Sequence, residues 1–132
     1  MSVRPLLEES RIDPAIRETV ARFHPGVVER ARRAIDDHDV VVIGMAQNPY
    51  VKKARKALEE AGVAFEYIEH GSYFSAWKPR LALKMWSGWP TFPMVFVQGT
   101  LVGGFAETEK LLERGELKRR LSGTGEAAPA AE

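Results

Sequence analysis

The sequence predicts an α/β fold in which helices flank a four-stranded mixed sheet. Residues 39–69 have the pattern of strand, helix and strand, and the usual right-handed crossover makes such a pair of strands parallel. Further along, two short β-rich runs meet at Gln98-Gly99, a dipeptide close to the Asn-Gly of tight hairpins. The 132 residues, with 45% hydrophobic and 28% charged content, suit one domain of ordinary composition.

The chain contains no cysteine. This excludes disulfides, thiolate nucleophiles, cysteine-ligated zinc and cysteine-held iron–sulfur clusters. The three histidines, His24, His38 and His70, lack the spacing of metal ligands, so we expect no metal site. No serine–histidine–acid set or phosphate loop is recognisable, and we expect no catalytic residue.

Charge and hydropathy narrow the range of partners. The net charge of +1 argues neither for nor against nucleic acid, and we expect no nucleic-acid partner. No apolar run approaches the ~20 residues of a membrane span. The opening MSVRPLLEES carries acidic residues by position 8 and has no apolar run typical of a signal peptide. We therefore expect a cytoplasmic protein with no membrane partner.

Residues 1–37 are expected to form an N-terminal helical extension. Asp13 is suited to cap a first helix, with Pro14 at its first position. A second helix carries an apolar stripe made of Val28, Ala31 and Ile35. Such a stripe favours packing onto the domain that follows, and the alternative is a contact with a second copy or another partner.

The predicted domain spans residues 38–121. The run DVVVIGM at 39–45 is typical of a strand buried on both faces, and VAFEYIEH at 63–70 of a second strand. The helix between them ends at Gly62. Its apolar face consists of Val51, Ala54, Leu58 and Ala61.

The segment SYFSAWKPRLALKMWSG at 72–88 predicts a further helix. Pro79 is tolerated only near a helix start, which favours Ser75 as the cap. Large apolar side chains recur there at helical spacing and favour a core position over a ligand cage. They are Phe74, Trp77, Leu81 and Met85.

The last part of the domain contains the hairpin and a final helix. MVFV and TLV are the strands, and Gly103-Gly104 breaks the second one. Residues 106–114 suit a helix with Leu111 and Leu112 turned inward. The remaining residues 122–132, SGTGEAAPAAE, lack periodicity and bulk and are expected to be disordered.

This order of elements, with its motifs, resembles the glutaredoxin family of the thioredoxin fold over residues 38–121. The run VVVIGMAQNPYVKKA is similar to a glutaredoxin strand that leads into the Cys-Pro-Tyr-Cys turn and its helix. The run WPTFPMVFVQGTLVGG is similar to the family's Trp-Pro-Thr-x-Pro segment and the Gly-Gly pair before its last helix. The resemblance implies a thioredoxin-like fold and a cis peptide bond between Phe92 and Pro93.

The resemblance also assigns the active-site turn. It places Asn48 at the position of the nucleophilic cysteine and Val51 at that of the resolving cysteine, while Pro49 and Tyr50 are kept. An asparagine amide cannot attack a disulfide. At a helix N-terminus it accepts hydrogen bonds from the N–H of the second or third helical residue, so Asn48 is predicted to keep the turn without its chemistry.

The same resemblance implies a ligand-binding segment on the other side of the turn. Its residues are Thr91, Phe92, Pro93, Gly103 and Gly104. Two glutathione contacts of the family are missing, because Met45 replaces a lysine and Ala106 replaces an aspartate. We expect glutathione binding to be weak or absent.

The residues around the turn leave two further questions open. Lys52, Lys53 and nearby cations are either the solvated face of a helix or, with free N–H groups at its start, an anion site. The aromatic side chains are either anchors for a partner or buried. They are Tyr50, Trp86, Trp89 and Phe92.

We therefore predict a glutaredoxin-like protein without the redox cysteines that serves as a non-catalytic binding module. Its ligand is a partner protein at the former active-site groove or, weakly, glutathione. The alternative is a protein of glutaredoxin lineage with a residual glutathione-linked redox role.

Overall fold

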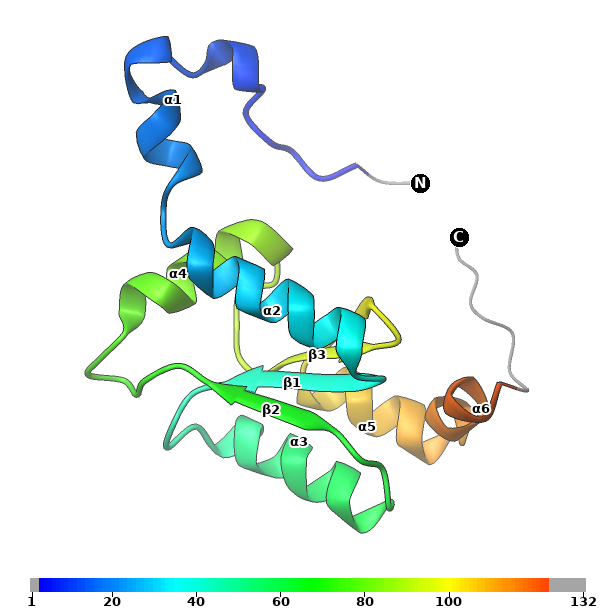
Figure 1. The fold of residues 1–132 in the computed structure, drawn as a ribbon. Coiled ribbons are helices and arrows are strands. Elements are labelled where there is room, and N and C mark those ends of the chain that lie inside the picture. Colours follow the sequence, from blue (N-terminus) through cyan, green and yellow to red (C-terminus); the bar gives the residue numbers. More distant parts are fainter. Residues whose placement is uncertain (1–2, 124–132) are drawn as a thin grey trace.

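The structure, a computed structural model that describes residues 3–123, is a single sheet with helices on both faces (Figure 1). In chain order the elements are η1 (Glu9–Arg11), α1 (Pro14–Ala21), α2 (Pro25–Asp37), β1 (Val40–Gly44), α3 (Pro49–Glu60), β2 (Glu66–Glu69), α4 (Trp77–Ser87), β3 (Met94–Val97), β4 (Thr100–Gly103), α5 (Phe105–Glu113) and α6 (Glu116–Ser122). Of the predicted tail, Ser122 is the last residue of α6, and residues 124–132 lie outside the described range.

The four strands form a mixed sheet in the order β2-β1-β3-β4. β1 pairs with β2 in parallel, whereas β3 runs antiparallel to both β1 and β4. This confirms the four-stranded mixed sheet that the sequence predicts. Within the sheet, β1 is central, and all five of its residues are buried.

Alternate residues of β1 face two separate apolar clusters, as the two-residue period of a strand requires. Val41 and Ile43 pack with Ala31 of α2 and Leu83 of α4. On the other face, the apolar side chains of β1 pack with helices α3 and α6; this cluster includes Val40, Val42, Leu58 and Leu117. Figure 1 shows α2 on one side of the sheet and α3 on the other. Helices on both faces explain why the strand is continuously apolar.

The predicted hairpin between β3 and β4 is present. Gln98 and Gly99 both have positive φ angles, of 49° and 83°. A two-residue turn with both residues in this region has the type I′ geometry that matches strand twist. The turn places Gly103 and Gly104 directly before α5.

The two N-terminal helices differ in how they pack. Asp13 caps α1 as predicted, with its Oδ1 accepting from the Ala15 N–H at 2.8 Å. No residue of α1 is buried, and the helix stands away from the sheet in Figure 1. By contrast, α2 contacts α4 and β1 and buries Ala31.

The predicted cap of α4 is wrong. The helix begins at Trp77, and its N-cap is Ala76, which has a φ of 57° and makes no side-chain capping bond. Ser75 instead closes the preceding loop, because its Oγ accepts from the Ser72 N–H at 3.2 Å. The hydroxyl therefore stabilises the loop and not the helix.

The predicted core stripe of α4 is also wrong. Phe74 is 93% exposed, Trp77 60%, Met85 54% and Leu81 37%. The helix turns a different face inward, the one that carries Ala82 and Leu83. Since α4 has apolar residues on both faces, periodicity alone does not decide which face meets the sheet.

Among residues 3–123, no helix has the length and apolar character to cross a membrane.

Candidate functional site

The turn after β1 is held by the side chain of Asn48. Its Oδ1 accepts hydrogen bonds from the Tyr50 N–H at 2.9 Å and the Val51 N–H at 3.1 Å. Asn48 has extended backbone angles, and Pro49 occupies the first helical position of α3. Both features are those of a well-formed N-cap, which confirms the predicted structural role of Asn48.

This cap closes the start of α3 to anions. Pro49 has no N–H, and the next two N–H groups donate to the Asn48 side chain. The Lys52 N–H donates to the Asn48 carbonyl at 3.1 Å. The hypothesis that free N–H groups at this helix start bind an anion is therefore wrong, because the asparagine itself occupies them.

Val51, which the sequence resemblance assigns to the second cysteine of the glutaredoxin turn, belongs to the core. It is 1% exposed, and a Cβ placed on Gly44 would lie 2.6 Å from Val51 Cγ1. Tyr50, its neighbour, is 56% exposed. The turn thus presents one aromatic side chain outward and uses the next residue to anchor α3 against β1.

The segment before β3 supplies the other side of the site. Thr91 is exposed, Phe92 and Pro93 are buried, and the peptide bond between the last two is cis. A Cβ on Gly104 would lie 3.3 Å from the Pro93 carbonyl oxygen. Glycine at this position therefore allows the start of α5 to come close to the segment.

Between these parts lies a groove of about 320 Å³. Its lining is Tyr50, Trp89, Thr91, Phe92, Pro93, Gly104, Phe105, Ala106 and Glu107. Five of the nine predicted site residues line the groove, namely Tyr50, Thr91, Phe92, Pro93 and Gly104. The other four, Asn48, Pro49, Val51 and Gly103, are not part of its lining. We call this hollow the turn groove.

Two residues of the turn groove, Phe105 and Glu107, are not among the site residues that the sequence predicts. Phe105 lines it from the start of α5. The Glu107 Oε1 accepts from the Gly104 N–H at 2.9 Å and holds the entry to that helix. The Gly-Gly pair directly before these residues was the signal that could have pointed to them.

Two lysines lie over aromatic rings of the turn groove. Lys53 Nζ is 5.2 Å from the centre of the Tyr50 ring and 6.0 Å from that of Phe105. Lys84 Nζ is 5.8 Å from the centre of the Phe92 ring. Among residues 3–123, neither lysine forms an ion pair. The groove therefore has a mostly apolar wall that also carries Glu107 and Thr91, with the two ammonium groups over its aromatic rings.

Trp89 adds an unsatisfied donor. Its Nε1 is buried, has no hydrogen-bond partner among residues 3–123, and lies 3.6 Å from the Cβ position of Gly104. Leaving a buried N–H unpaired costs about 1–3 kcal/mol. Trp86, by contrast, packs into the core beside Phe96, with ring centres 6.1 Å apart. The aromatic side chains in reach of a partner are thus Tyr50, Trp89 and Phe105.

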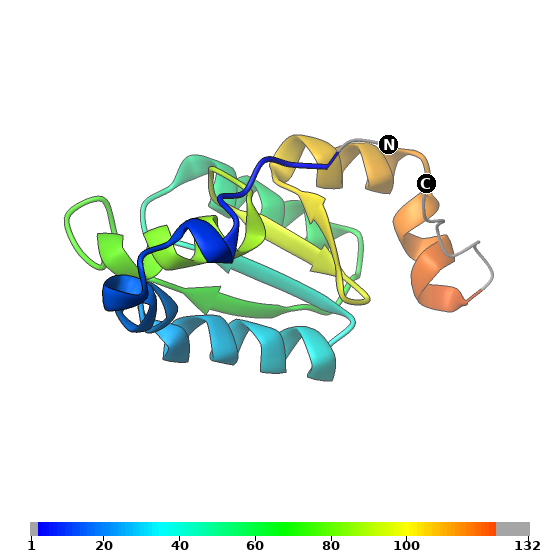
Figure 2. The ribbon, with the colours of Figure 1, turned by 90° about the horizontal axis from the view of Figure 1, so that it is seen from above.

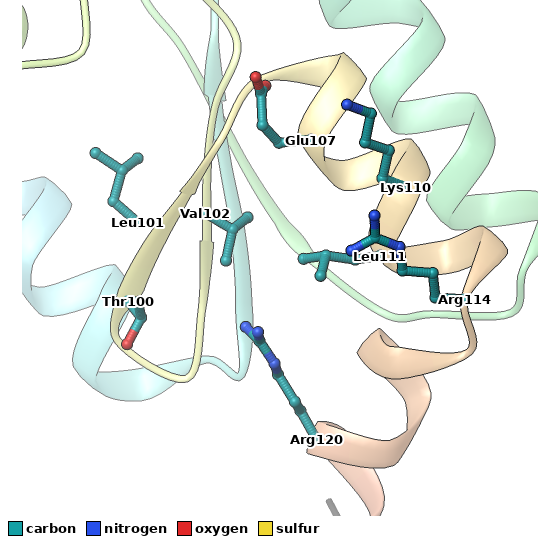
Figure 3. A pocket seen from close by; sticks show the side chains of 8 residues that line it. All are labelled: Thr100, Leu101, Val102, Glu107, Lys110, Leu111, Arg114 and Arg120. Atoms are coloured by element: carbon teal, nitrogen blue, oxygen red, sulfur yellow. The ribbon is translucent and has the colours of Figure 1, made fainter. Parts of the chain in front are cut away.

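A second hollow of about 320 Å³ lies beside β4, on the other side of Glu107 (Figure 3). Its lining is Thr100, Leu101, Val102, Glu107, Lys110, Leu111, Arg114 and Arg120. Figure 3 shows Arg120 reaching from α6 toward β4. Arg120 is already ion-paired with Glu116 at 2.6 Å, so one of the three cations here is neutralised within the chain.

The two positions at which the resemblance implies a lost glutathione contact, Met45 and Ala106, have different surroundings. Met45 is 6% exposed and belongs to the core, so a lysine there would have to bury its charge. Ala106 lies at the edge of the turn groove and is exposed. No group of histidines and carboxylates in the described part of the chain has the arrangement of a metal site.

Two titratable groups away from the groove have shifted pKa values. Burial lowers the pKa of His70, and the charges of Arg30 and Arg80 act in the same direction. Burial also raises the pKa of Tyr67, and its hydroxyl donates to Glu69 Oε1 at 2.8 Å. Neither residue lines the turn groove, so these shifts concern stability and not the site.

Comparisons with known proteins give a consistent result. A family model described as glutaredoxin matches residues 40–102. A glutaredoxin-like protein of Dictyostelium discoideum is 49% identical over 98 residues, which are 74% of this chain and 80% of that protein. Glutaredoxin 4 of Buchnera aphidicola is 32% identical over 73% of this chain and 92% of that protein.

Solved structures agree on the fold. A crystal structure of buckwheat glutaredoxin in complex with glutathione matches with a TM-score of 0.64 and 21% identity, over 79% of this chain and 94% of that one. The sheet order and the likeness to these structures define a thioredoxin-like fold, and the turn after β1, capped by Asn48, has no thiol. The chain belongs to the glutaredoxin family and lacks cysteine altogether.

Proposed function

We propose that this protein is a non-catalytic binding module whose turn groove holds a segment of a partner protein. One observation carries the proposal. The Asn48 cap occupies the donors at the start of α3, while the groove beside it stays open and Tyr50 is 56% exposed. The scaffold that presents a substrate is thus kept, and the group that would react with it is absent.

The chemistry of the groove defines the partner segment. An aromatic or aliphatic side chain fits between Tyr50, Trp89 and Phe105, since large apolar anchors carry most binding energy at protein interfaces. A carboxylate next to that side chain fits the unpaired ammonium groups of Lys53 and Lys84. The partner segment is therefore apolar and acidic.

Glutathione is the weaker ligand in this proposal. The buckwheat glutaredoxin of the same fold is described in complex with glutathione, which supports glutathione as a candidate ligand. Without the lysine and aspartate at positions 45 and 106, two charge-assisted contacts are lost, each worth about 1.5–3 kcal/mol. Their sum corresponds to a loss in affinity of more than about a hundredfold.

The alternative is a residual redox role in which another protein supplies the thiol. The family membership supports it, because relatives in the comparison carry glutaredoxin names. In that case the groove would hold glutathione or a mixed disulfide, and the chain would act only in the presence of the other protein's cysteine.

A peptide selection tests the proposal. The intact protein is used to select from a random peptide library, and the affinity of the enriched peptides is measured for variants Tyr50→Ser and Tyr73→Ser. Both tyrosines are 56% exposed, but only Tyr50 lines the groove, so Tyr73→Ser is a matched control. We expect acidic, aromatic-containing peptides whose affinity falls at least about tenfold in Tyr50→Ser alone.

Two results would contradict the proposal. One is that no peptide is enriched, and the other is that Tyr50→Ser leaves the affinity of the enriched peptides unchanged. The redox alternative is favoured if glutathione displaces the peptides at a concentration lower than the one at which the peptides themselves bind.

A further inference from the structure

β4 leaves one edge of the sheet open. In the strand order β2-β1-β3-β4 it pairs with β3 alone, and Figure 2 shows it at the edge of the sheet on the side of α5. Val97 and Thr100 flank the two-residue turn and pair with each other, so the next residue, Leu101, turns its N–H and C=O away from β3. Among residues 3–123, no hydrogen bond outside the β3–β4 ladder reaches the backbone of Thr100, Leu101 or Val102.

The two edges of the sheet differ in charge. β2, which forms the other edge, carries Glu66 and Glu69, and charged side chains on an edge strand discourage pairing with another chain. β4 has the sequence TLVG, with neither a charged residue nor a proline. β4 is therefore the edge at which a further strand can add.

The hollow beside β4 supplies a wall for such a strand, and we call this hollow of about 320 Å³ the β4 groove. Its floor is apolar and consists of the half-buried side chains of Val102 and Leu111. Lys110 and Arg114 lie about one helical turn apart, and Figure 3 shows the head groups of both on the β4 side of α5. Among residues 3–123, neither cation forms an ion pair.

The other charges at the β4 groove are already engaged. Arg120 is paired with Glu116 at 2.6 Å, and Glu107 accepts from a backbone N–H at the start of α5 at 2.9 Å. Glu109 and Glu113 of α5 are not part of the lining. The lining thus has three cations against one carboxylate, and two of the cations are unpaired. This balance is complementary to an anionic ligand.

We propose that the β4 groove holds an extended, acidic segment of a partner protein, which adds to the sheet as a fifth strand beside β4. The backbone of the segment pairs with the N–H and C=O of Leu101, as in β-strand addition. Because side chains alternate along a strand, every second one lies on the α5 side, where carboxylates meet Lys110 and Arg114. This site is separate from the turn groove, since the two linings share only Glu107.

An acidic strand fits the β4 groove better than two other occupants. A second copy of the chain, paired through its own β4, brings a second Lys110 and a second Arg114 to the same place, and β4 has no carboxylate to meet them. A small free anion meets the cations but leaves the backbone groups of Leu101 unpaired. The open edge and the two cations together therefore select an extended segment with carboxylates.

Calorimetric titration of the intact protein tests the charge pairing. The probes are acetylated and amidated heptapeptides in which glutamate alternates with valine, threonine or tyrosine, and the same peptides with lysine in place of glutamate. We expect the glutamate peptides alone to bind, and Lys110→Glu/Arg114→Glu to raise their dissociation constant at least about tenfold. The control Lys52→Glu/Lys56→Glu, an equal charge change at the same spacing on exposed positions of α3, is expected to leave it unchanged.

Backbone methylation tests the strand pairing. Two forms of the best glutamate peptide are made, one methylated at the glutamate nitrogens and the other at the remaining nitrogens. A strand pairs with β4 through only one of these two sets of N–H groups, so one form is expected to lose at least about tenfold in affinity. At saturation with the unmethylated peptide, hydrogen exchange of the Leu101 N–H is expected to slow at least about tenfold, and that of Ala64, in an exposed loop, to stay the same.

Four results would overturn the proposal. The first is that none of the glutamate peptides binds, and the second is that the lysine peptides bind equally well. The third is that the two charge-reversal variants weaken binding equally, which would show attraction to net charge alone. The fourth is that both methylated forms keep the full affinity while exchange at Leu101 is unchanged, which would show an anion site without strand addition.

Discussion

The side chain of Val51 occupies the space that a Cβ on Gly44 would need. An alanine there would bring its methyl group within 2.6 Å of Val51 Cγ1 and 2.9 Å of Cγ2. The start of α3 and the end of β1 can approach this closely only because position 44 is glycine. The capped turn that follows Gly44 is therefore placed by packing as well as by its hydrogen bonds.

Gly44→Ala is expected to destabilise the protein by about 1–3 kcal/mol, since overpacking at a buried contact forces side chains or backbone to move. Urea unfolding followed by circular dichroism measures the change. Gly26→Ala is the control, because a Cβ there meets nothing within 4 Å and alanine is a better helix former. If both variants change the free energy of unfolding by the same amount, the close contact between position 44 and Val51 is contradicted.

Asn48→Ala is expected to lower the free energy of unfolding by about 1 kcal/mol, because the Tyr50 and Val51 N–H groups lose their shared acceptor. Asn48→Ser, which keeps a capping oxygen, is expected to retain most of the stability. The same urea titration gives both values. If alanine and serine are equally tolerated, the amide does not serve as a cap.

Asn48→Cys is expected to give a reactive thiol. A thiolate at that position accepts from the same two N–H groups and lies at the positive end of the α3 dipole, which lowers the pKa of the thiol below the ~8.5 of a free cysteine. The rate of alkylation at pH 7 is compared with that of Ala64→Cys in an exposed loop. Equal rates would show that the turn does not activate a thiol.

Turnover by the same variant is expected to be poor and to improve with Ala106→Asp. Position 106 is exposed at the edge of the turn groove, so a carboxylate there is solvated and available to a ligand. Met45→Lys is expected to cost stability instead, because Met45 lies in the core. Each of the two substitutions is combined with Asn48→Cys. The rate of glutathione-dependent reduction and the urea midpoint, measured for both combined variants, separate an effect on turnover from an effect on stability.

The pH dependence of stability is expected to include a contribution from His70. Its pKa in the folded chain lies below the ordinary 6.5, first because the ring is buried and then because of Arg30 and Arg80. The unfolded chain therefore binds a proton at His70 more readily, and the free energy of unfolding falls as the pH drops below 6.5 and is full above it. His70→Gln is expected to flatten this part of the curve, and an unchanged slope would contradict it.

The parts of the fold that the sequence predicts well are those with one dominant local signal. The continuous apolar run of β1 requires cover on both faces, and Gln98-Gly99 requires a tight hairpin. Asp13 and Asn48 each precede a proline at a helix start, and both act as caps. In these cases neighbouring residues decide the structure, so no distant contact is needed to predict it.

The parts that the sequence does not settle depend on contacts between distant residues. α4 has apolar residues on both faces, and its packing against α2 and the core side chains of the sheet leaves Leu83 buried and Trp77 exposed. Phe105 joins the turn groove because Gly104 lets α5 approach Pro93, a contact between segments that no local pattern reveals. α6, which starts after Gly115 at a φ of 71°, is too short for its period to be recognised.

We expect the wild-type chain to keep the glutaredoxin turn as a helix cap and to lack its thiol chemistry. Glutathione-dependent disulfide reduction with the wild-type chain, purified free of other glutaredoxins, tests this expectation most directly. Because the chain has no cysteine and Asn48 holds the turn, we expect no turnover above a heat-treated control. Reduction above that control by the intact wild-type protein would show that the turn supports disulfide chemistry without a thiol of its own.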